Sequence, residues 1–549
     1  MSFGIYTKNS NYFIIIVKGE NMKKIKFLLL VVALFMSFGC ISVSAETGKK
    51  PGTITTKEDL IYYIYYYGGM ARLDGNTVKL TSSLELAQEL SFNNTESVTL
   101  DLNGNGIYFS GSDSKIMVYE NAKDVTITDS SNSDRDYIRS QSNFAIYNSS
   151  SVGVVTVSNT MLVTNSSLPA IYTYGFSKTN VVNTTVRGDN IGIGAGANST
   201  VFVKNSKVSL GNPTGEVGID LANSNVTITN SDVNVYSGAT KGIAIKSEGD
   251  RSNLIINSGK FNAYKSAVYV SEGKATINGG LFESNNNHAF RTSTNAVING
   301  GIFKSNCMAG VQIMGASTNV VLNEGTFMAG SSSNIGGLAL PLGSDISTYV
   351  GKTSIIDNDF TLSKNGLSYT ESKEVNISSL PKTKKLSTTT YTYNGYVREP
   401  NVTVTNNLGK KLVKGTDYKL IYQSGRKYVG KYYVQIIYLG KYKTLKSEKL
   451  YFTINPKGTY ISNLSRGKKR LTVKVSKRTS QTTGYQIMYS SSKKFSGYKT
   501  VKMTNKNTSK TIKGLKSGKR YYVKVRTYKV SNGKTYYSSW SKVKSAVVK

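Results

Sequence analysis

Residues 277–282 read Ile-Asn-Gly-Gly-Leu-Phe, and residues 298–303 read Ile-Asn-Gly-Gly-Ile-Phe. In both stretches an apolar residue is followed five positions later by another. The same spacing recurs at intervals of 21 to 28 residues, at Val157/Leu162, Val181/Val186, Val203/Val208, Ile228/Val233, Ile256/Phe261, Ile277/Phe282, Ile298/Phe303 and Leu322/Phe327. Each unit of such a repeat buries its apolar residues only by stacking on its neighbours, so the repeat predicts a solenoid.

A second apolar column lies between these pairs, and most of its members follow Gly or Ala. It consists of Ile146, Ile171, Ile193, Ile219, Ile243, Val268, Phe290 and Val311. The intervening segments are short β-rich runs, such as residues 226–229, separated by Asn, Ser and Gly, which favour tight turns. We therefore expect roughly ten coils of short strands, stacked at about 4.8 Å per coil.

The two Ile-Asn-Gly-Gly segments make this part of the chain resemble the right-handed parallel β-helix family, which includes pectin-lyase-like proteins. The resemblance implies an all-β fold with a right-handed parallel β-helix solenoid over residues 98–360. Residues 46–97 are expected to form its N-terminal cap. Within the cap, residues 57–66 have the pattern of a short amphipathic helix with Thr56 as N-cap, which would cover the exposed edge of the first coil.

Residues 1–45 have the pattern of an N-terminal extension followed by a secretory signal peptide. Residues 22–26 are basic, residues 27–36 are apolar, and residues 43–45 are small enough for cleavage. The apolar stretch is too short to span a bilayer comfortably, so we expect a secreted, extracellular protein with no transmembrane anchor. Met22 is an alternative start. After cleavage Cys307 would be the one remaining cysteine, and no intrachain disulfide is expected.

The composition changes after Pro381 towards Lys, Tyr and Thr, and the repeat stops. Residues 361–382 are expected to form a linker. Through their Tyr-Thr-Tyr-Asn-Gly, Gly-Thr-Asp-Tyr and Gly-Lys-Tyr-Tyr-Val segments, residues 383–455 resemble a bacterial immunoglobulin-like β-sandwich. Residues 457–549 resemble a fibronectin type III β-sandwich, in which Leu515 and Tyr521 have the spacing of a tyrosine corner. Trp540, the single Trp, is expected to be a packing residue.

The whole net charge of +37 lies in residues 381–549, which contain 40 Lys and Arg and three acidic residues. In an exported protein such a basic region favours anionic envelope polymers as partners, and we expect association with the cell wall of a Gram-positive-type bacterium. Nucleic acid is the rival partner, but no recognition helix, zinc spacing or RNA-binding motif supports a specific nucleic-acid site. A cationic surface that serves only solubility is the third alternative.

In the second apolar column, the residue after each inward one should point outward. These positions are Tyr147, Tyr172, Gly194, Asp220, Ala244, Tyr269, Arg291 and Gln312. Tyrosine rings suit the apolar faces of sugars, and polar groups between them suit the hydroxyls. We therefore expect a glycan-binding groove formed by Tyr147, Tyr172, Asp220, Tyr269, Arg291 and Gln312.

Many members of the β-helix family are polysaccharide lyases or galacturonan hydrolases, so catalysis is the alternative. A hydrolase needs two carboxylates about 5 to 9.5 Å apart, but the outward column contains only Asp220. A lyase would need Ca²⁺ ligands and a base such as Arg291 or Lys246. Asp220 and Arg291 are therefore the catalytic candidates. No metal site and no cofactor is predicted, and Ca²⁺ would be required only by a lyase.

The features together predict a cell-surface protein whose β-helix binds a polysaccharide or host glycan, in an adhesion role, and whose basic region holds the envelope. A polysaccharide lyase or glycoside hydrolase is the alternative function, and a purely structural spacer is a third. The single His, His288, lies in an Asn-rich turn and is expected at the surface.

Overall fold

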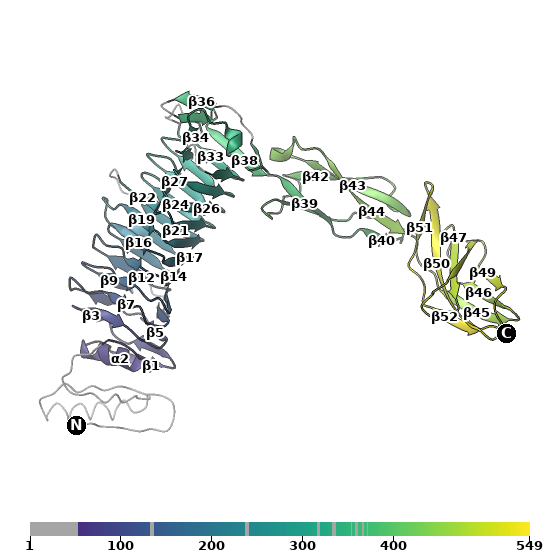
Figure 1. Ribbon diagram of the computed structural model, residues 1–549, viewed down its shortest axis with the longest axis horizontal. Helices are drawn as coiled ribbons and strands as arrows, with labels where there is room; N and C mark the ends of the chain where they lie inside the picture. The colour runs from purple at the N-terminus through teal and green to yellow at the C-terminus, as the bar shows by residue number, and fades with distance from the viewer. Residues whose placement is uncertain are drawn as a thin grey trace, which may run out of the picture. The chain divides into compact units, whose positions relative to one another are not determined.

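The computed structural model describes residues 53–131, 137–235, 241–315, 319–331, 336–352, 354–356, 361–364, 367–370 and 372–549. The fold is almost entirely β and divides into two compact units, Met1–Ser379 and Leu380–Lys549 (Figure 1). In the described part of the chain, no helix has the length and apolarity needed to cross a membrane. The predicted signal peptide lies outside the described residues.

The front unit is a parallel β-solenoid of about ten turns, built from three long sheets. The parallel strands of sheet A are β4 (Leu90–Phe92), β7 (Ile116–Val118), β10 (Ile146–Asn148), β13 (Ile171–Thr173), β16 (Ile191–Gly196), β19 (Val217–Ala222), β22 (Ile243–Glu248), β25 (Val268–Val270), β28 (Phe290–Thr292), β31 (Val311–Ile313) and β34 (Leu338–Pro341).

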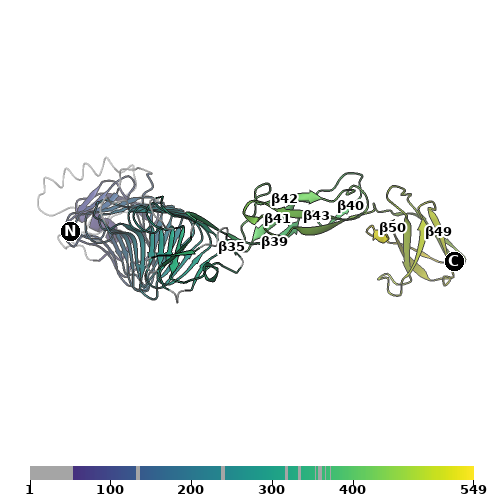
Figure 2. The same ribbon diagram turned by 90° about the horizontal axis from the view of Figure 1, so that it is seen from above.

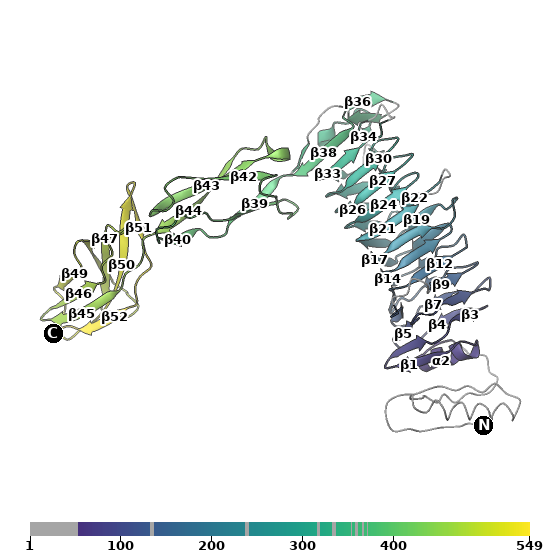
Figure 3. The ribbon, with the colours of Figure 1, turned by 180° about the vertical axis from the view of Figure 1, so that it is seen from behind.

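Sheet B stacks in the same way, and Figure 3 shows several of its strands above one another. Its parallel strands are β2 (Thr77–Leu80), β5 (Val98–Asp101), β8 (Val125–Thr128), β11 (Val154–Ser158), β14 (Lys178–Val182), β17 (Thr200–Lys204), β20 (Asn225–Thr229), β23 (Asn253–Ile256), β26 (Lys274–Ile277), β29 (Asn295–Ile298) and β32 (Val320–Leu322). Sheet C contains β3 (Leu84–Leu86), β6 (Ile107–Phe109), β9 (Tyr137–Ser140), β12 (Met161–Thr164), β15 (Thr185–Gly188), β18 (Lys207–Leu210), β21 (Ser231–Val235), β24 (Gly259–Ala263), β27 (Leu281–Ser284), β30 (Ile302–Ser305) and β33 (Gly325–Met328).

The apolar pairs five residues apart fill the inside of the solenoid, as predicted. The first member of each pair lies on sheet B and the second on sheet C, on the two sides of a tight turn. Phe282 is fully buried, and its ring stacks at 4.9 Å on Phe261 and at 4.6 Å on Phe303. Each coil therefore places the same kind of residue on its neighbour, which is how a solenoid buries a continuous core.

An asparagine ladder stabilises the turn between sheets B and C. The side-chain amide of Asn278 donates to Asn257 at 2.8 Å, and the amide of Asn299 donates to Asn278 at 2.9 Å. Asn205 is bonded in the same way to Asn183 at 3.1 Å, but its φ of +50° places it in the left-handed region, which Asn tolerates better than most residues. The side-chain amide of each Asn in the ladder is therefore hydrogen-bonded to the Asn of the neighbouring coil.

One member of the second column differs from the prediction. Ile245, not Ile243, pairs with Ile219 on one side and with Val268 on the other, and Ile245 is fully buried. Ala244, which the sequence assigned to the outward position, is also fully buried. The outward residue of this coil is therefore Lys246.

Helix α2 (Lys57–Tyr66) forms at the predicted residues with Thr56 as N-cap. Thr56 and Asp59 form a reciprocal capping box, which satisfies two backbone donors of the first turn. Leu60 and Ile64 belong to the same hydrophobic core as the first coils, so the helix covers this end of the solenoid. Antiparallel β1 (Ala71–Asp74) pairs with β2, and the parallel ladders begin at Thr77, inside the segment assigned to the cap.

Antiparallel strands close the other end of the solenoid, in the segment expected to be a linker. β37 (Leu367–Thr370) pairs with β34 and with β36 (Thr361–Lys364), and β38 (Glu374–Ser379) pairs with β33 and with β35 (Ser354–Ile356). A short 3-10 helix (Ile346–Thr348) precedes them. Antiparallel pairing occupies the edge that a further coil would otherwise extend.

His288 is only 1 % exposed, so the expectation of a surface residue was wrong. Its Nδ1 lies 3.0 Å from the carbonyl oxygen of Ala309, which fixes Nδ1 as the protonated nitrogen of the neutral ring. Burial lowers the pKa of His288 to about 4. The imidazole is therefore neutral in the folded protein at pH 7.

The rear unit contains two β-sandwich-like modules, and Figure 2 labels strands of the first. The first module contains β39 (Pro381–Leu386), β40 (Thr390–Thr392), β41 (Val402–Asn406), β42 (Tyr418–Tyr422), β43 (Gly430–Tyr438), a 3-10 turn (Gly440–Tyr442) and β44 (Glu448–Asn455). The second contains β45 (Ile461–Gly467), β46 (Arg470–Val475), β47 (Gly484–Ser490), β48 (Lys499–Thr504), β49 (Ser509–Lys513), β50 (Arg520–Ser531), β51 (Lys534–Tyr537) and β52 (Lys544–Val547). In the second module, β45-β46-β49 form one sheet, and β48-β47-β50-β51 with β52 form the other.

The second module contains the predicted tyrosine corner. The Tyr521 hydroxyl accepts a hydrogen bond from the backbone amide of Lys516 at 3.3 Å. Trp540 packs, but not in the hydrophobic core of this module. It is half-buried, and its ring lies 4.3 Å from the Arg526 guanidinium and 5.2 Å from Lys524 Nζ.

Candidate functional site

The outer face of sheet A carries the predicted site residues in one ladder. In register across the strands lie Met117, Tyr147, Tyr172, Gly194, Asp220, Lys246, Tyr269, Arg291 and Gln312. All six predicted groove residues therefore share a face. They do not form one continuous groove, because the ladder divides into three parts with different chemistry.

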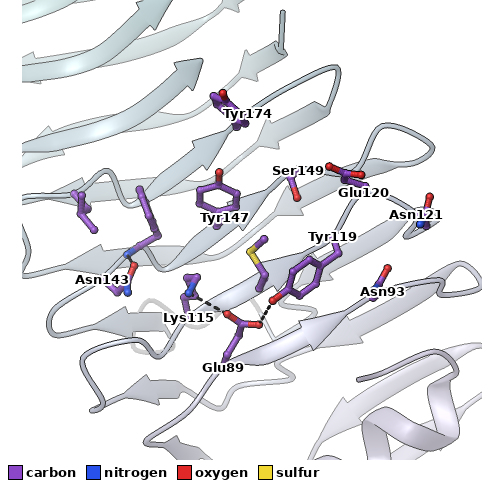
Figure 4. Close-up of a pocket in the computed structure, with 13 residues that line it drawn as sticks. Glu89, Asn93, Lys115, Tyr119, Glu120, Asn121, Asn143, Tyr147, Ser149 and Tyr174 are labelled. Atoms are coloured by element: carbon purple, nitrogen blue, oxygen red, sulfur yellow. Dashed lines mark hydrogen bonds and ion pairs between the residues drawn. The ribbon is translucent and has the colours of Figure 1, made fainter. Parts of the chain in front are cut away.

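The first part is a pocket of about 720 Å³ at the early coils of sheet A (Figure 4). Its walls are mainly aromatic rings, amides and carboxylates, from Glu89, Asn93, Lys115, Met117, Tyr119, Glu120, Asn121, Asn143, Phe144, Tyr147, Ser149, Leu168 and Tyr174. Tyr119, Ser149 and Tyr174 each lie two residues beyond an outward ladder position, so strand alternation brings them to the same face. Of the predicted residues, Tyr147 lines this pocket.

Glu89 is the most constrained charge of the pocket. Its Oε2 lies 3.0 Å from Lys115 Nζ, and its Oε1 accepts a hydrogen bond from the Tyr119 hydroxyl at 2.9 Å (Figure 4). The Ser91 hydroxyl also donates to Oε1. Burial raises the pKa of Glu89, but the bonds from Ser91, Lys115 and Tyr119 together outweigh it and hold the pKa below its usual value. Glu89 is therefore an oriented carboxylate that stays ionised at neutral pH.

Three aromatic rings that line the pocket pack around a fourth ring, that of Tyr172. Phe144 stacks on Tyr172 at 5.4 Å, Tyr147 lies 5.5 Å from Tyr172, and Tyr172 stacks on Tyr174 at 6.1 Å. A side chain at Gly194 would place its Cβ 2.6 Å from Tyr172 Cδ2, so the glycine gives this ring its space. Tyr172 does not line the pocket, but it packs against Phe144, Tyr147 and Tyr174, which do.

The middle part of the ladder is charged. Asp220 is largely withdrawn from solvent, and one of its carboxylate oxygens is buried without a hydrogen-bond partner. Burial raises its pKa, although Lys246 opposes the shift. Lys246 forms an ion pair with Glu248 at 2.8 Å. Asp220 and Lys246 thus form a small mixed-charge surface next to Tyr172.

The last part of the ladder is tied up in contacts of its own. The Arg291 guanidinium lies 5.4 Å from the centre of the Tyr269 ring, and its Nε donates to the sulfur of Met314 at 3.0 Å. Gln312 is only 8 % exposed and does not offer its amide to a ligand on this face. Asp220 and Arg291, the two catalytic candidates, lie in different parts of the ladder, separated in register by Lys246 and Tyr269.

The acidic residues of the described segments are dispersed. Among the described residues, no group of three or more His, Cys, Asp or Glu side chains is placed to hold a metal ion. Asp129 accepts backbone hydrogen bonds from Gly104 and Ser131, as a turn residue does.

Sequence reasoning missed most of the pocket. Glu89, Lys115 and Tyr119 lie on coils before Ile146, where the counted second column began. One pattern in the sequence does point to the pocket. Ser149 and Tyr174, which line it, lie two positions after Tyr147 and Tyr172. Extending that spacing backwards to Met117 leads to Tyr119.

No family model matches the chain, and no curated protein matches it. Solved structures with local likeness include a β-1,2-glucanase from Parabacteroides distasonis, at 16% identity and a TM-score of 0.15 over 21% of this chain. The chain spans 17% of the length of that glucanase. A chicken tenascin segment of two fibronectin type III domains matches at 16% identity over 31% of this chain and 98% of its own, with a TM-score of 0.20. The chicken CNTN1 FN1–FN3 domains match at 15% identity over 33% and 71%, with a TM-score of 0.16. Scores this low carry no argument about function.

Proposed function

We propose that this chain is a secreted surface protein whose solenoid binds a glycan in the sheet A pocket and whose basic modules hold an anionic polymer of the cell envelope. The solenoid and the fibronectin-like fold are consistent with an extracellular carbohydrate-binding protein. The observation that carries the proposal is the composition of the pocket. The role is attachment to a glycan surface.

The pocket offers the two kinds of contact that sugars use. The rings of Tyr147, Tyr174 and Phe144 provide flat apolar faces, and Asn93 and Asn121 provide amide donors and acceptors for hydroxyls. A pocket of about 720 Å³ falls within the range of about 300 to 1,000 Å³ typical of ligand sites. These features favour one to a few sugar units.

The charge of the pocket narrows the glycan class. Glu89 and Glu120 contribute two carboxylates, while Lys115 is the one basic residue among the lining side chains and pairs with Glu89. An acidic sugar would meet net negative charge in a partly desolvated site, which is unfavourable. The proposed ligand is therefore an uncharged or amino sugar rather than a uronate.

A matched pair of aromatic substitutions tests the glycan site. Tyr174 lines the pocket, whereas Phe176, two residues further along the same turn, is 73% exposed and does not. In glycan-array and calorimetric binding experiments with the full chain, Tyr174→Ala should weaken binding of the best neutral glycan roughly three- to tenfold, by loss of ring contact. Phe176→Ala should leave the affinity unchanged. Equal affinities for both variants and the parent would place the site elsewhere.

The envelope part of the proposal rests on the shortage of acids in the rear unit. Glu448 forms an ion pair with Lys384 at 2.9 Å, and Glu399 forms one with Arg426. Asp417 accepts a hydrogen bond from the backbone amide of Val413. Forty basic residues thus have three carboxylates among them, and all three carboxylates are engaged. Such a surface attracts polyanions, and the attraction weakens as salt screens it.

Binding to purified walls of a Gram-positive-type bacterium tests this part separately. The full chain should sediment with the walls in 50 mM NaCl and be released at about 0.5 M, where the Debye length falls to about 4 Å. A chain that lacks residues 381–549 should stay in the supernatant at every salt concentration. Retention of the shortened chain would contradict the role of the basic modules, without touching the glycan site.

Glycoside hydrolysis is a second candidate function. It is favoured by the presence of two carboxylates, Glu89 and Glu120, in the lining of one pocket. A hydrolase uses one carboxylate as acid and another as base or nucleophile, and the ionised state of Glu89 suits the base or nucleophile. New reducing ends released from a bound neutral glycan would establish hydrolysis. Glu89→Gln should then abolish turnover but retain binding, whereas binding without turnover in the parent leaves the adhesion proposal standing.

A further inference from the structure

The outer face of the five-stranded sheet in the second module carries a row of alternating rings and cations. In order along the row, the residues are Phe495, Lys524, Trp540, Arg526, Tyr537, Lys502 and Tyr528, with cation-to-ring distances of 4.2, 5.2, 4.3, 3.7, 5.9 and 5.2 Å. Each cation in the row thus lies between two rings, an arrangement that stabilises the charge electrostatically. Phe495 has a φ of +60°, which is costly for a bulky residue, and the turn nevertheless holds its ring at Lys524.

Arg526 is the fixed centre of this row. Its guanidinium lies 3.7 Å from the Tyr537 ring and 4.3 Å from the Trp540 ring, and its Nε donates to Gln486 Oε1 at 2.8 Å. Gln486 and Arg526 are register partners in adjacent strands, so the bond crosses the sheet directly. Two ring faces and one edge bond therefore set the plane and the direction of the guanidinium.

The outer edge of the guanidinium remains uncommitted. Within residues 380–549, all of which are described, the two terminal nitrogens of Arg526 have no hydrogen-bond partner and are not buried. Lys524 and Lys502 lie beside it in the row, and each of the three acidic residues of this unit is engaged elsewhere. A planar fork of N–H donors of this kind matches two oxygens of an oxyanion.

We propose that Arg526, flanked by Lys524 and Lys502, forms a preorganised site for a tetrahedral oxyanion, the phosphate or sulfate group of an anionic polymer. This inference refines the envelope-binding part of the proposed function by assigning it one specific contact in addition to net charge. The aromatic row orients the guanidinium before the anion arrives, which reduces the ordering cost of binding. Phosphodiesters and sulfate esters share this geometry, so the experiment includes both.

Trp540 makes the site observable, because it is the single Trp of the chain and its ring stacks on Arg526. Inorganic phosphate is titrated into the full chain at constant ionic strength, with chloride as the balancing anion, while Trp fluorescence is recorded. The proposal expects a saturable fluorescence change with phosphate and none with chloride. A change that chloride reproduces, or none with either anion, would overturn it.

A charge-conserving pair of variants separates the fork from net charge. Arg526→Lys removes the planar fork and should lower the phosphate affinity about tenfold, as expected for loss of a bidentate charged contact. Arg520→Lys lies on the same strand, β50, and Arg520 has no aromatic ring stacked on it among the described residues. It should bind like the parent. Equal affinities of the two variants would contradict the site, and because the parent titration needs no substitution, a misfolded variant does not remove the test.

The polymer source is distinguished by a second set of titrations with polyphosphate and dextran sulfate. Tighter binding of polyphosphate than of dextran sulfate assigns the site to phosphate polymers, and the reverse order assigns it to sulfated glycans. The phosphate titration can succeed even if the chain does not bind cell walls, so failure of the wall experiment and failure of this site are distinguishable.

Discussion

The solenoid and the basic modules stabilise β-sheets in opposite ways. In the solenoid, like stacks on like, as Phe282 stacks on Phe261 and Phe303, and acidic and basic residues balance in residues 1–380. In the modules, unlike stacks on unlike, as Arg526 lies between Tyr537 and Trp540. Rings replace the missing acids as partners for cations. The solenoid is therefore stabilised by the same apolar contact repeated from coil to coil. The modules instead stabilise their many cations by contact with aromatic rings.

The sharpest way to break the solenoid is to interrupt its phenylalanine stack. Phe282→Ala removes a fully buried ring between two stacked neighbours and should lower the free energy of unfolding by about 3 to 5 kcal/mol. Phe202→Ala, at a ring that is 44% exposed, should cost less than about 1 kcal/mol. Urea unfolding followed by circular dichroism compares the two. Similar losses for both variants would show that the stack contributes no more than surface packing.

Acid should destabilise the solenoid through His288, and the modules contain no His. The pKa of His288 is about 4 when folded and about 6.5 when unfolded. Between these values the unfolded state binds a proton that the folded state does not, so stability falls as the pH falls. The loss should approach about 3 kcal/mol at pH 4 and vanish above pH 7.

Comparison with His288→Asn isolates this effect. The variant should have a shallower dependence of unfolding free energy on pH between 4 and 6.5, measured by urea titration at each pH. Trp540 fluorescence follows the second module alone and supplies an internal reference. Parallel pH profiles for parent and variant would show that folding does not shift the pKa of His288.

Salt should affect the two regions differently. Raising NaCl from 0.05 to 0.5 M screens repulsion among the 40 basic residues and should stabilise the modules by about 1 kcal/mol. The neutral solenoid should respond less. In thermal unfolding, Trp540 fluorescence of the full chain gives the transition of the second module, and circular dichroism of a chain that lacks residues 381–549 gives that of the solenoid. Equal shifts of the two transitions would remove electrostatics from the comparison.

The last comparison lies within the asparagine ladder. Asn278 and Asn205 each donate to one ladder neighbour and accept from another, but only Asn205 has a positive φ. Asn278→Ala should cost about 1 kcal/mol for the lost hydrogen bonds. Asn205→Ala should cost about 1 kcal/mol more, because Ala is strained in the left-handed region. Equal costs in urea unfolding would show that backbone strain does not contribute.

Much of the fold could be predicted because the repeat is written in apolar residues. The pairs such as Ile277/Phe282 fix both the turn and the inward face. The prediction that Ile243 points inward was wrong for a specific reason. Gly242-Ile243 and Ala244-Ile245 both match the pattern of Gly or Ala followed by an apolar residue, and only the packing of the coil distinguishes them. The prediction that His288 lies at the surface was wrong because its Asn-rich sequence suggests an exposed turn, whereas its burial depends on the next coil.

The site was harder to predict than the fold. Outward residues such as Tyr147 and Tyr172 follow from alternation, but which ring lines the pocket and which supports it depends on how Tyr172 lies over Gly194. Glu89 comes from another coil, and its pairing with Lys115 and Tyr119 is a contact between distant positions of the sequence. Local patterns contain no information about such contacts.

The two Ile-Asn-Gly-Gly coils, in register and 21 residues apart, are interchangeable units. Removing 21 residues from Asn278 to Ile298 would join Ile277 to Asn299, which reproduces the original junction. A gene segment of about 63 nucleotides could therefore be lost or duplicated by unequal recombination without disturbing either cap. Each such event would change the length of the solenoid by about 4.8 Å and leave the pocket on the early coils intact. The repeat thus makes the distance along the solenoid from the pocket to its last coil a heritable, stepwise variable.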